Sequence, residues 1–277
     1  MEWKDLSHHT RKTPLSFVMP SVEDVDAMYD APICAFSGNE TESPVVVLAT
    51  ASYRGMEPDV MTAWNKLYAR TCWDFGEGNV WATPTRERLP YPYAPLLSLA
   101  SAFKTEDVTG RRFDWLLWID DDVVVPSLVL RKLIESAHPD DRPFVATIGF
   151  DRTPPFRPAV WEYLTAGACT SKMQWQDPHM GTGLHKVAAT GLCCALFHRS
   201  FFDRVPQPWF ASTPGELGED RSISYRGNPD SWLCQQCVDA DVPIYVDTDI
   251  EVAHMGQRIP ITFRTVDALR ELFGKKS

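Results

Sequence analysis

Short apolar runs alternate with amphipathic, helix-length segments over the first half of the chain. The runs predict strands at 44–49, 79–83, 115–119 and 144–149. Because polar residues barely interrupt these runs, each strand is expected to be buried on both faces, as in a parallel sheet. The segments between them predict helices at 58–70, 93–103 and 126–137. This alternation predicts an α/β fold with a doubly wound, mostly parallel sheet.

The pattern changes after residue 150. Residues 152–183 are rich in Pro, Gly, Trp and Tyr and show no helical period, which is typical of a binding loop. A strand-like run returns at 187–197, interrupted by Gly191. The last third of the chain predicts one helix and two short strands, at 230–239, 244–246 and 250–253.

Length and composition favour one large domain. Residues 1–43 are polar without a sustained period and are expected to be an N-terminal extension, and residues 44–277 a single domain. No apolar run reaches the roughly eighteen residues of a membrane-spanning helix. The N-terminus also lacks the apolar core of a secretion signal. We therefore expect no membrane anchor and a cytoplasmic location.

Charge and cysteine content narrow the function classes. The formal net charge of −10 argues against broad nonspecific binding to nucleic acid, although a local basic groove stays compatible with it. Seven cysteines without a regular framework fit a reducing compartment better than a disulfide scaffold. Cys234 and Cys237 form a lone CxxC in a helix-like stretch, where we expect core packing rather than zinc binding or redox chemistry.

Three consecutive carboxylates, Asp120, Asp121 and Asp122, follow the apolar run at 115–119. Because strand side chains alternate, Asp120 and Asp122 point the same way and Asp121 points opposite. Ligands of open α/β sheets collect at the carboxyl ends of strands. Two carboxylates converging there are costly without a cation, and oxygen ligands favour Mg²⁺ or Mn²⁺ over zinc. A metal site is therefore expected, the alternative being a solvated acidic turn.

This segment resembles the DxD motif of GT-A fold glycosyltransferases, in which a divalent metal holds the diphosphate of a nucleotide sugar. Three further segments also match the family, and all four occur in the family's order along the chain. They are the strand and loop at 45–53, the glycine-containing strand from Thr190, and the run at 230–254. The resemblance covers roughly residues 44–256 and is to family 2-like, stand-alone bacterial and phage enzymes. It implies a GT-A fold with an irregular acceptor-loop region.

The resemblance also implies roles for individual residues. Asp122 matches the main metal ligand, and Asp120 matches the residue that reaches the ribose or the metal shell. Asp121 takes the variable middle position of the motif. His254 matches the histidine that completes the metal site, so that Mn²⁺ or Mg²⁺ is the expected cofactor.

The catalytic carboxylate has two candidates. Asp230 matches the acidic residue that opens the family's helix, and its spacing to that helix favours it. Pro229 stands where a Glu is common, however, and Asp220 in the upstream Gly-Glu-Asp segment is the alternative. Asp241 replaces the usual turn glycine, a tolerable change because Asp adopts left-handed backbone more readily than most residues.

Donor contacts are expected from the other matching segments. The residues concerned are Thr50, Ser52 and Tyr53 for the base, Arg86 and Arg88 for the diphosphate, and Gly191 beneath the sugar and acceptor. The alternatives are a polar turn, solvated arginines and a β-bulge, respectively. Arg152 and Arg157, in the irregular loop, are further candidates for contacting phosphate or an anionic acceptor.

The implied reaction is sugar transfer from a nucleoside-diphosphate sugar, expected to be a UDP-sugar, to a hydroxyl. Acceptors of similar enzymes include saccharides, small molecules, proteins and hydroxymethylated DNA bases. Trp161, Trp175 and Trp209 are candidates for stacking on the acceptor, with core packing as the alternative. Inversion is preferred over retention. A sugar-nucleotide nucleotidyltransferase and an inactive sugar-nucleotide binding module are the competing functions, and the loop Thr-Ala-Ser-Tyr-Arg-Gly at 50–55 is too poor in glycine to favour the former.

Overall fold

The computed structural model describes the chain from residue 43 to residue 274 with gaps. The described ranges are 43–51, 55–83, 93–152, 154, 156–161, 181–211, 213–217, 223–226, 229–256, 259–262 and 265–274. The N-terminal extension predicted for residues 1–43 lies outside these ranges except for its last residue. Most of the expected acceptor loop, residues 162–180, also lies outside them.

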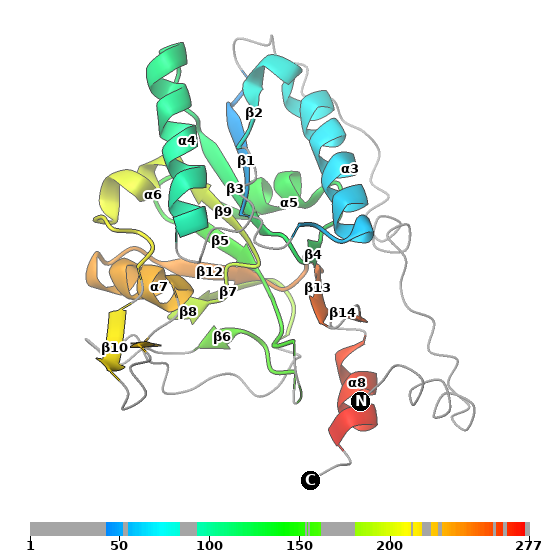
Figure 1. The fold of residues 1–277 in the computed structure, drawn as a ribbon. Helices are drawn as coiled ribbons and strands as arrows, with labels where there is room; N and C mark the ends of the chain where they lie inside the picture. The colour runs from blue at the N-terminus through cyan, green and yellow to red at the C-terminus, as the bar shows by residue number, and fades with distance from the viewer. Residues whose placement is uncertain are drawn as a thin grey trace.

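A seven-stranded sheet forms the centre of the fold (Figure 1). Its order is β2-β1-β3-β9-β5-β12-β7. The strands are β1 (Val46–Ala51), β2 (Val80–Ala82), β3 (Trp115–Asp120), β5 (Phe144–Thr147), β7 (Leu184–Val187), β9 (Cys194–His198) and β12 (Ile244–Asp247). Strands β1, β2, β3, β5 and β12 run in one direction, and β9 and β7 run in the opposite one. The mostly parallel α/β sheet predicted from the apolar runs is thus confirmed.

Helices cover both faces of this sheet. They are α3 (Pro58–Phe75), α4 (Tyr93–Thr109), α5 (Val129–Ser136), α6 (Arg199–Arg204), α7 (Pro229–Asp239) and α8 (Val266–Gly274). On one face, Leu116 and Trp118 of β3 share a core with residues of α4, α6 and α7. On the other, Leu117 and Ile119 share a core with residues of α3 and α5. Alternation along β3 therefore produces the doubly wound arrangement.

Three small sheets complete the described structure. β4 (Val123–Val124) pairs with β13 (Ala253–Gly256), which also pairs with β14 (Ile259–Ile261). β6 (Val160–Trp161) pairs with β8 (Ala189–Thr190), and β10 (Thr213–Leu217) pairs with β11 (Ile223–Arg226). In Figure 1, β4, β13 and β14 lie below the end of β3. Strand β4 begins at Val123, directly after the acidic strand end.

Several predicted boundaries differ from the observed ones. The run predicted as one strand at 187–197 is divided: Val187 ends β7, and later residues form β8 and β9. Between β8 and β9, the N–H groups of Gly191 and Leu192 donate to the Ala159 carbonyl, next to β6, and to the Asp230 carboxylate rather than to a strand of the central sheet. The strand predicted at 250–253 is wrong in extent: β13 begins at Ala253, where pairing with β4 begins. Helix α5 begins at Val129, not at 126.

Two local predictions about α7 and its turn are confirmed. Asp241 has a φ of 52°, the left-handed conformation expected of a residue in the position of a turn glycine. Cys234 and Cys237 carry thiols rather than a disulfide and are buried in the core against the sheet. The Sγ atom of Cys234 lies 3.6 Å from the carbonyl oxygen of Thr190. The CxxC pair therefore packs between helix and sheet.

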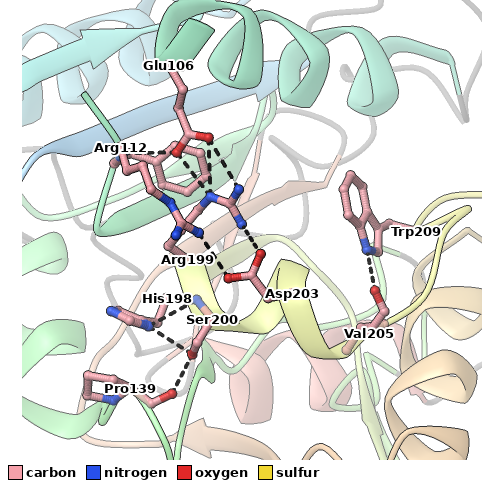
Figure 2. A network of polar contacts seen from close by, with 10 residues as sticks. Glu106, Arg112, Pro139, His198, Arg199, Ser200, Asp203, Val205 and Trp209 are labelled. Carbon is pink, nitrogen blue, oxygen red and sulfur yellow. Dashed lines mark hydrogen bonds and ion pairs between the residues drawn. The ribbon is translucent and has the colours of Figure 1, made fainter. Parts of the chain in front are cut away.

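An ion pair connects α4 to α6 (Figure 2). Nε of Arg199 donates to Oε1 of Glu106 at 3.0 Å, and Nη1 of Arg199 donates to Asp203 at 2.7 Å. The guanidinium also lies 4.8 Å from the ring centroid of Phe103, within cation–π range. Nearby, the indole N–H of Trp209 donates to the carbonyl of Val205, and Trp209 is only 8% exposed. Trp209 therefore packs in the core, which is the alternative to stacking on an acceptor.

Within the described ranges, no helix is both long enough and apolar enough to cross a membrane.

Candidate functional site

The carboxyl end of β3 carries the predicted carboxylates. The backbone N–H of Asp120 donates to the carbonyl of Cys193 at 2.9 Å, which extends the pairing of β3 with the segment before β9. The indole N–H of Trp118 donates to Oδ1 of Asp120, also at 2.9 Å. The two side chains are two residues apart on a strand and so share a face, as the alternation requires. Asp120 is therefore held in place from within the core.

The β4–β13 pairing brings His254 to Asp122. His254 lies opposite Val123 in the register, and the N–H of Met255 donates to the carbonyl of Asp122 at 2.8 Å. As a result, Nε2 of His254 lies 3.3 Å from Oδ1 of Asp122. The two residues predicted to share a metal are thus neighbours, although they are far apart in the sequence.

A backbone carbonyl orients the imidazole of His254. Its Nδ1 lies 2.7 Å from the carbonyl oxygen of Phe150. Because a carbonyl oxygen only accepts, Nδ1 must carry the proton, and in the neutral ring Nε2 then presents a lone pair toward Asp122. A lone pair facing a carboxylate is unfavourable without a proton or metal ion between them. Metal-binding histidines commonly donate their second N–H in this way.

The second oxygen of Asp122 accepts an ion pair from Arg152. Nη1 of Arg152 lies 2.5 Å from Oδ2, and the Arg152 side chain is 57% exposed against 23% for Asp122. Burial by itself would raise the pKa of Asp122, but the hydrogen bond and charge that His254 supplies when its ring is protonated, with the charge of Arg152, lower it below the ordinary value. The surroundings thus favour the carboxylate form that a metal requires.

Asp230 completes the group. It lies in the first turn of α7, and its Oδ2 accepts from the backbone N–H of Leu192 at 3.2 Å. Burial, followed by the negative charges of Asp230 and Asp122, raises the pKa of Asp120 well above its ordinary range. Asp120 therefore lies close enough to both of the other carboxylates to be repelled by them. Such a concentration of negative charge is a site where a cation would be stabilised.

The described residues do not form a closed metal cage. No group of three or more His, Cys, Asp or Glu side chains among them is arranged to hold a metal ion. Asp122 and His254 offer one carboxylate and one imidazole instead. Mg²⁺ and related cations are often held by one or two carboxylates together with oxygens of a bound phosphate. The residues present fit a metal that is shared with a phosphorylated ligand.

The other predicted site residues have varied positions. Thr50 is fully buried, and its Oγ1 has no hydrogen-bond partner in the described part of the chain, while its carbonyl accepts from Ser98. Gly191 lies against Ala159: a Cβ added to Gly191 would be 3.1 Å from that of Ala159. Asp121 is half-buried. Outside the described residues lie Ser52, Tyr53, Arg86, Arg88 and Asp220.

Three groups at the site were not predicted: the indole of Trp118, the amide of Leu192 and the carbonyl of Phe150. The contact of Trp118 with Asp120 could have been predicted from the sequence, because the two residues are two positions apart on a strand and share a face. The two backbone groups had no such signal, since nearly every residue carries such groups. Elsewhere, a pocket of about 640 Å³ lies between α4 and α6, but its charged residues Arg199 and Asp203 are paired with each other. The strand end is therefore the better candidate site.

No family model matches this chain, and neither does any curated protein. Solved structures that are similar to it include the following three. A197 from STIV is 13% identical, with a TM-score of 0.44 over 78% of this chain and 93% of that one. A nucleoside-diphosphate-sugar pyrophosphorylase from Vibrio cholerae RC9 is 9% identical, with a TM-score of 0.42 over 76% and 95%. A glycosyltransferase involved in the glycosylation of the major capsid of PBCV-1 is 12% identical, with a TM-score of 0.27 over 60% and 69%. Similarity this distant is no evidence for an activity of this chain.

Proposed function

We propose that the protein is a metal-dependent glycosyltransferase of the GT-A type that transfers a sugar from a nucleoside-diphosphate sugar to an acceptor hydroxyl. One observation carries the proposal: three carboxylates and an imidazole converge at the carboxyl end of β3. These residues are Asp120, Asp122, Asp230 and His254. The donor is expected to be a UDP-sugar, and the acceptor to belong to the classes named above.

Asp122, His254 and Asp120 would act on the donor, whose diphosphate is the leaving group. Asp122 and His254 would hold Mn²⁺ or Mg²⁺, which supplies positive charge to the departing diphosphate. Asp120, oriented by Trp118, lies beside this pair, where it would contact the ribose or the metal shell. The electronegative site would otherwise repel a diphosphate, so binding of the nucleotide depends on the cation.

Asp230 is the proposed general base. Its carboxylate accepts from the Leu192 amide and is therefore oriented before any ligand binds. It would take the proton of the acceptor hydroxyl as that oxygen forms a bond to the anomeric carbon and the bond to the diphosphate breaks. A single displacement of this kind inverts the anomeric centre. The contact of Asp230 with the Leu192 amide, beside the acidic strand end, supports this assignment.

UDP release from a panel of UDP-sugars, measured with Mn²⁺ and with EDTA, tests the proposal. Slow donor hydrolysis gives a signal without a known acceptor. Asp122→Asn should lower Mn²⁺ affinity at least about tenfold and abolish Mn²⁺-dependent thermal stabilisation by UDP. Asp203→Asn, which changes an exposed carboxylate that pairs with Arg112 and Arg199 away from the strand end, is the matched control and should keep the parental Mn²⁺ affinity and UDP release.

Two outcomes would contradict the proposal. If Asp122→Asn releases UDP at the parental rate, the metal assignment is wrong. If the protein instead forms pyrophosphate from UTP and a sugar 1-phosphate and releases no UDP from UDP-sugars, it is a nucleotidyltransferase.

A further inference from the structure

Arg152 pairs with the carboxylate that would hold a divalent cation. Its Nη1 contacts Oδ2 of Asp122 at 2.5 Å, while Oδ1 of the same carboxylate faces Nε2 of His254 at 3.3 Å. Both oxygens of Asp122 are thus engaged within the protein. A metal ion bound to Asp122 and a guanidinium on the same carboxylate would repel each other across a few ångströms. Metal binding therefore competes with the Arg152 contact.

The backbone that carries Arg152 is held in place. Phe150 and Pro158 form an antiparallel bridge, the N–H of Asp151 donates to the carbonyl of Arg157, and the N–H of Ala159 donates to the carbonyl of Gly149. Both of these hydrogen bonds measure 2.8 Å. These paired segments, residues 149–152 and 156–159, form a ribbon. Phe150 in this ribbon also supplies the carbonyl that orients His254. The ribbon is therefore part of the site itself.

Residues 156–159, the returning half of the ribbon, are anchored as well. The carbonyl of Phe156 accepts from Nη2 of Arg270 at 3.2 Å, and the carbonyl of Ala159 accepts from the N–H of Gly191 at 2.8 Å. By contrast, the Arg152 side chain is 57% exposed. An exchange of partners by this side chain requires rotation of its own bonds and no movement of the ribbon.

We propose that Arg152 takes the place of the cation on Asp122 in the metal-free protein and moves to the nucleotide diphosphate when a divalent cation binds. This inference rests on the proposed function. A guanidinium matches phosphate oxygens as well as it matches a carboxylate, so the diphosphate offers Arg152 a partner equivalent to the one it loses. Metal and nucleotide then bind cooperatively, because each relieves a cost that the other would meet alone.

The test is a Mn²⁺ titration of the full-length protein, followed by the electron paramagnetic resonance signal of free Mn²⁺, without and with saturating UDP. An exposed ion pair is weak. Arg152→Gln is therefore expected to bind Mn²⁺ alone about three- to fivefold more tightly than the parent. The factor by which UDP tightens Mn²⁺ binding should fall at least about threefold. Arg152→Lys keeps the charge and should keep that factor within about twofold of the parent.

Arg112→Gln removes another exposed ion pair, with Asp203, and should leave both affinities unchanged. Unchanged Mn²⁺ affinity in Arg152→Gln would overturn the inference, and so would an equal change in Arg112→Gln. The inference and the proposed function fail separately. If the protein shows metal-dependent turnover but Arg152→Gln binds Mn²⁺ like the parent, only the proposed exchange of Arg152 between Asp122 and the diphosphate is wrong. If Arg152→Gln binds Mn²⁺ more tightly but the protein turns over no UDP-sugar, the exchange of Arg152 is supported and the proposed glycosyltransferase activity is wrong.

Discussion

Trp118 and Asp120 lie on the same face of β3, and a 2.9 Å hydrogen bond joins the indole N–H to the carboxylate. Trp118 is completely buried in the core that α4, α6 and α7 share with the sheet. The first carboxylate of the acidic strand end is therefore oriented by a side chain that cannot move without disturbing that core. Preorganisation of this kind is what a site for a highly charged ligand requires.

The first prediction concerns Asp230. Asp230→Asn should lower sugar transfer by about two to four orders of magnitude, the usual range for loss of a general base. An amide oxygen can still accept from the Leu192 N–H, so donor affinity and thermal stability should stay close to parental. Steady-state kinetics and UDP titration give both readouts. Asp220→Asn should be milder, and the opposite ranking would transfer the catalytic role to Asp220.

The second prediction is a pH dependence at the start of α6. Burial lowers the pKa of His198 below its ordinary 6.5, although Asp114, Asp140 and Asp203 act in the opposite direction. Between pH 6.5 and that lower value the unfolded chain binds more protons than the folded one, so stability falls as pH falls through this window. His198→Asn removes this effect while keeping an acceptor for the Ser200 N–H.

Urea unfolding at pH 7.5 and pH 5.5 checks this prediction. The stability of the parent minus that of His198→Asn should be smaller at the lower pH. A difference that does not change with pH would mean that His198 titrates alike in the folded and unfolded states.

The third prediction concerns the ion pair between α4 and α6 (Figure 2). The Arg199 and Glu106 side chains are 16% and 11% exposed. Arg199→Met would leave Glu106 without its cation and should reduce the free energy of unfolding by about 3 kcal/mol. Adding Glu106→Gln should recover part of this loss, because Gln still accepts from the Phe113 N–H.

Arg112→Met provides the control in the same denaturation experiment. Its ion pair with Asp203 is exposed, at 63% and 54%, and should contribute less than about 1 kcal/mol. Equal losses in Arg199→Met and Arg112→Met would refute the role assigned to burial.

The fourth prediction concerns Gly191. A Cβ at this position would lie 3.1 Å from that of Ala159, so Gly191→Ala should displace the ribbon and cost about 1–2 kcal/mol. Turnover should fall as well, because the adjacent Leu192 N–H holds Asp230. Ala159→Gly in the same chain opens the space and should restore both properties, as measured by thermal unfolding and UDP release. If Ala159→Gly restores neither stability nor UDP release, the effect of Gly191→Ala does not come from the contact with Ala159.

Much of the architecture follows from local sequence properties. The apolar run at 115–119 is too continuous for an amphipathic strand, and β3 is indeed buried on both faces up to Asp120. Side chains alternate along any strand, so the shared face of Trp118 and Asp120 follows from their spacing alone. The left-handed turn at Asp241 likewise depends on the residue type and its immediate surroundings.

The assembly of the site required the tertiary structure. Strand β9 inserts antiparallel between β3 and β5, and β13 pairs with β4, which together place Leu192 and His254 beside the acidic strand end. The contacts of Asp230 with the Leu192 amide and of His254 with the Phe150 carbonyl use backbone groups. All residues carry a backbone carbonyl and all except proline carry an N–H, so no residue type marks these groups. The sequence alone determined which side chains are available for chemistry, and long-range strand pairing decided which of them meet.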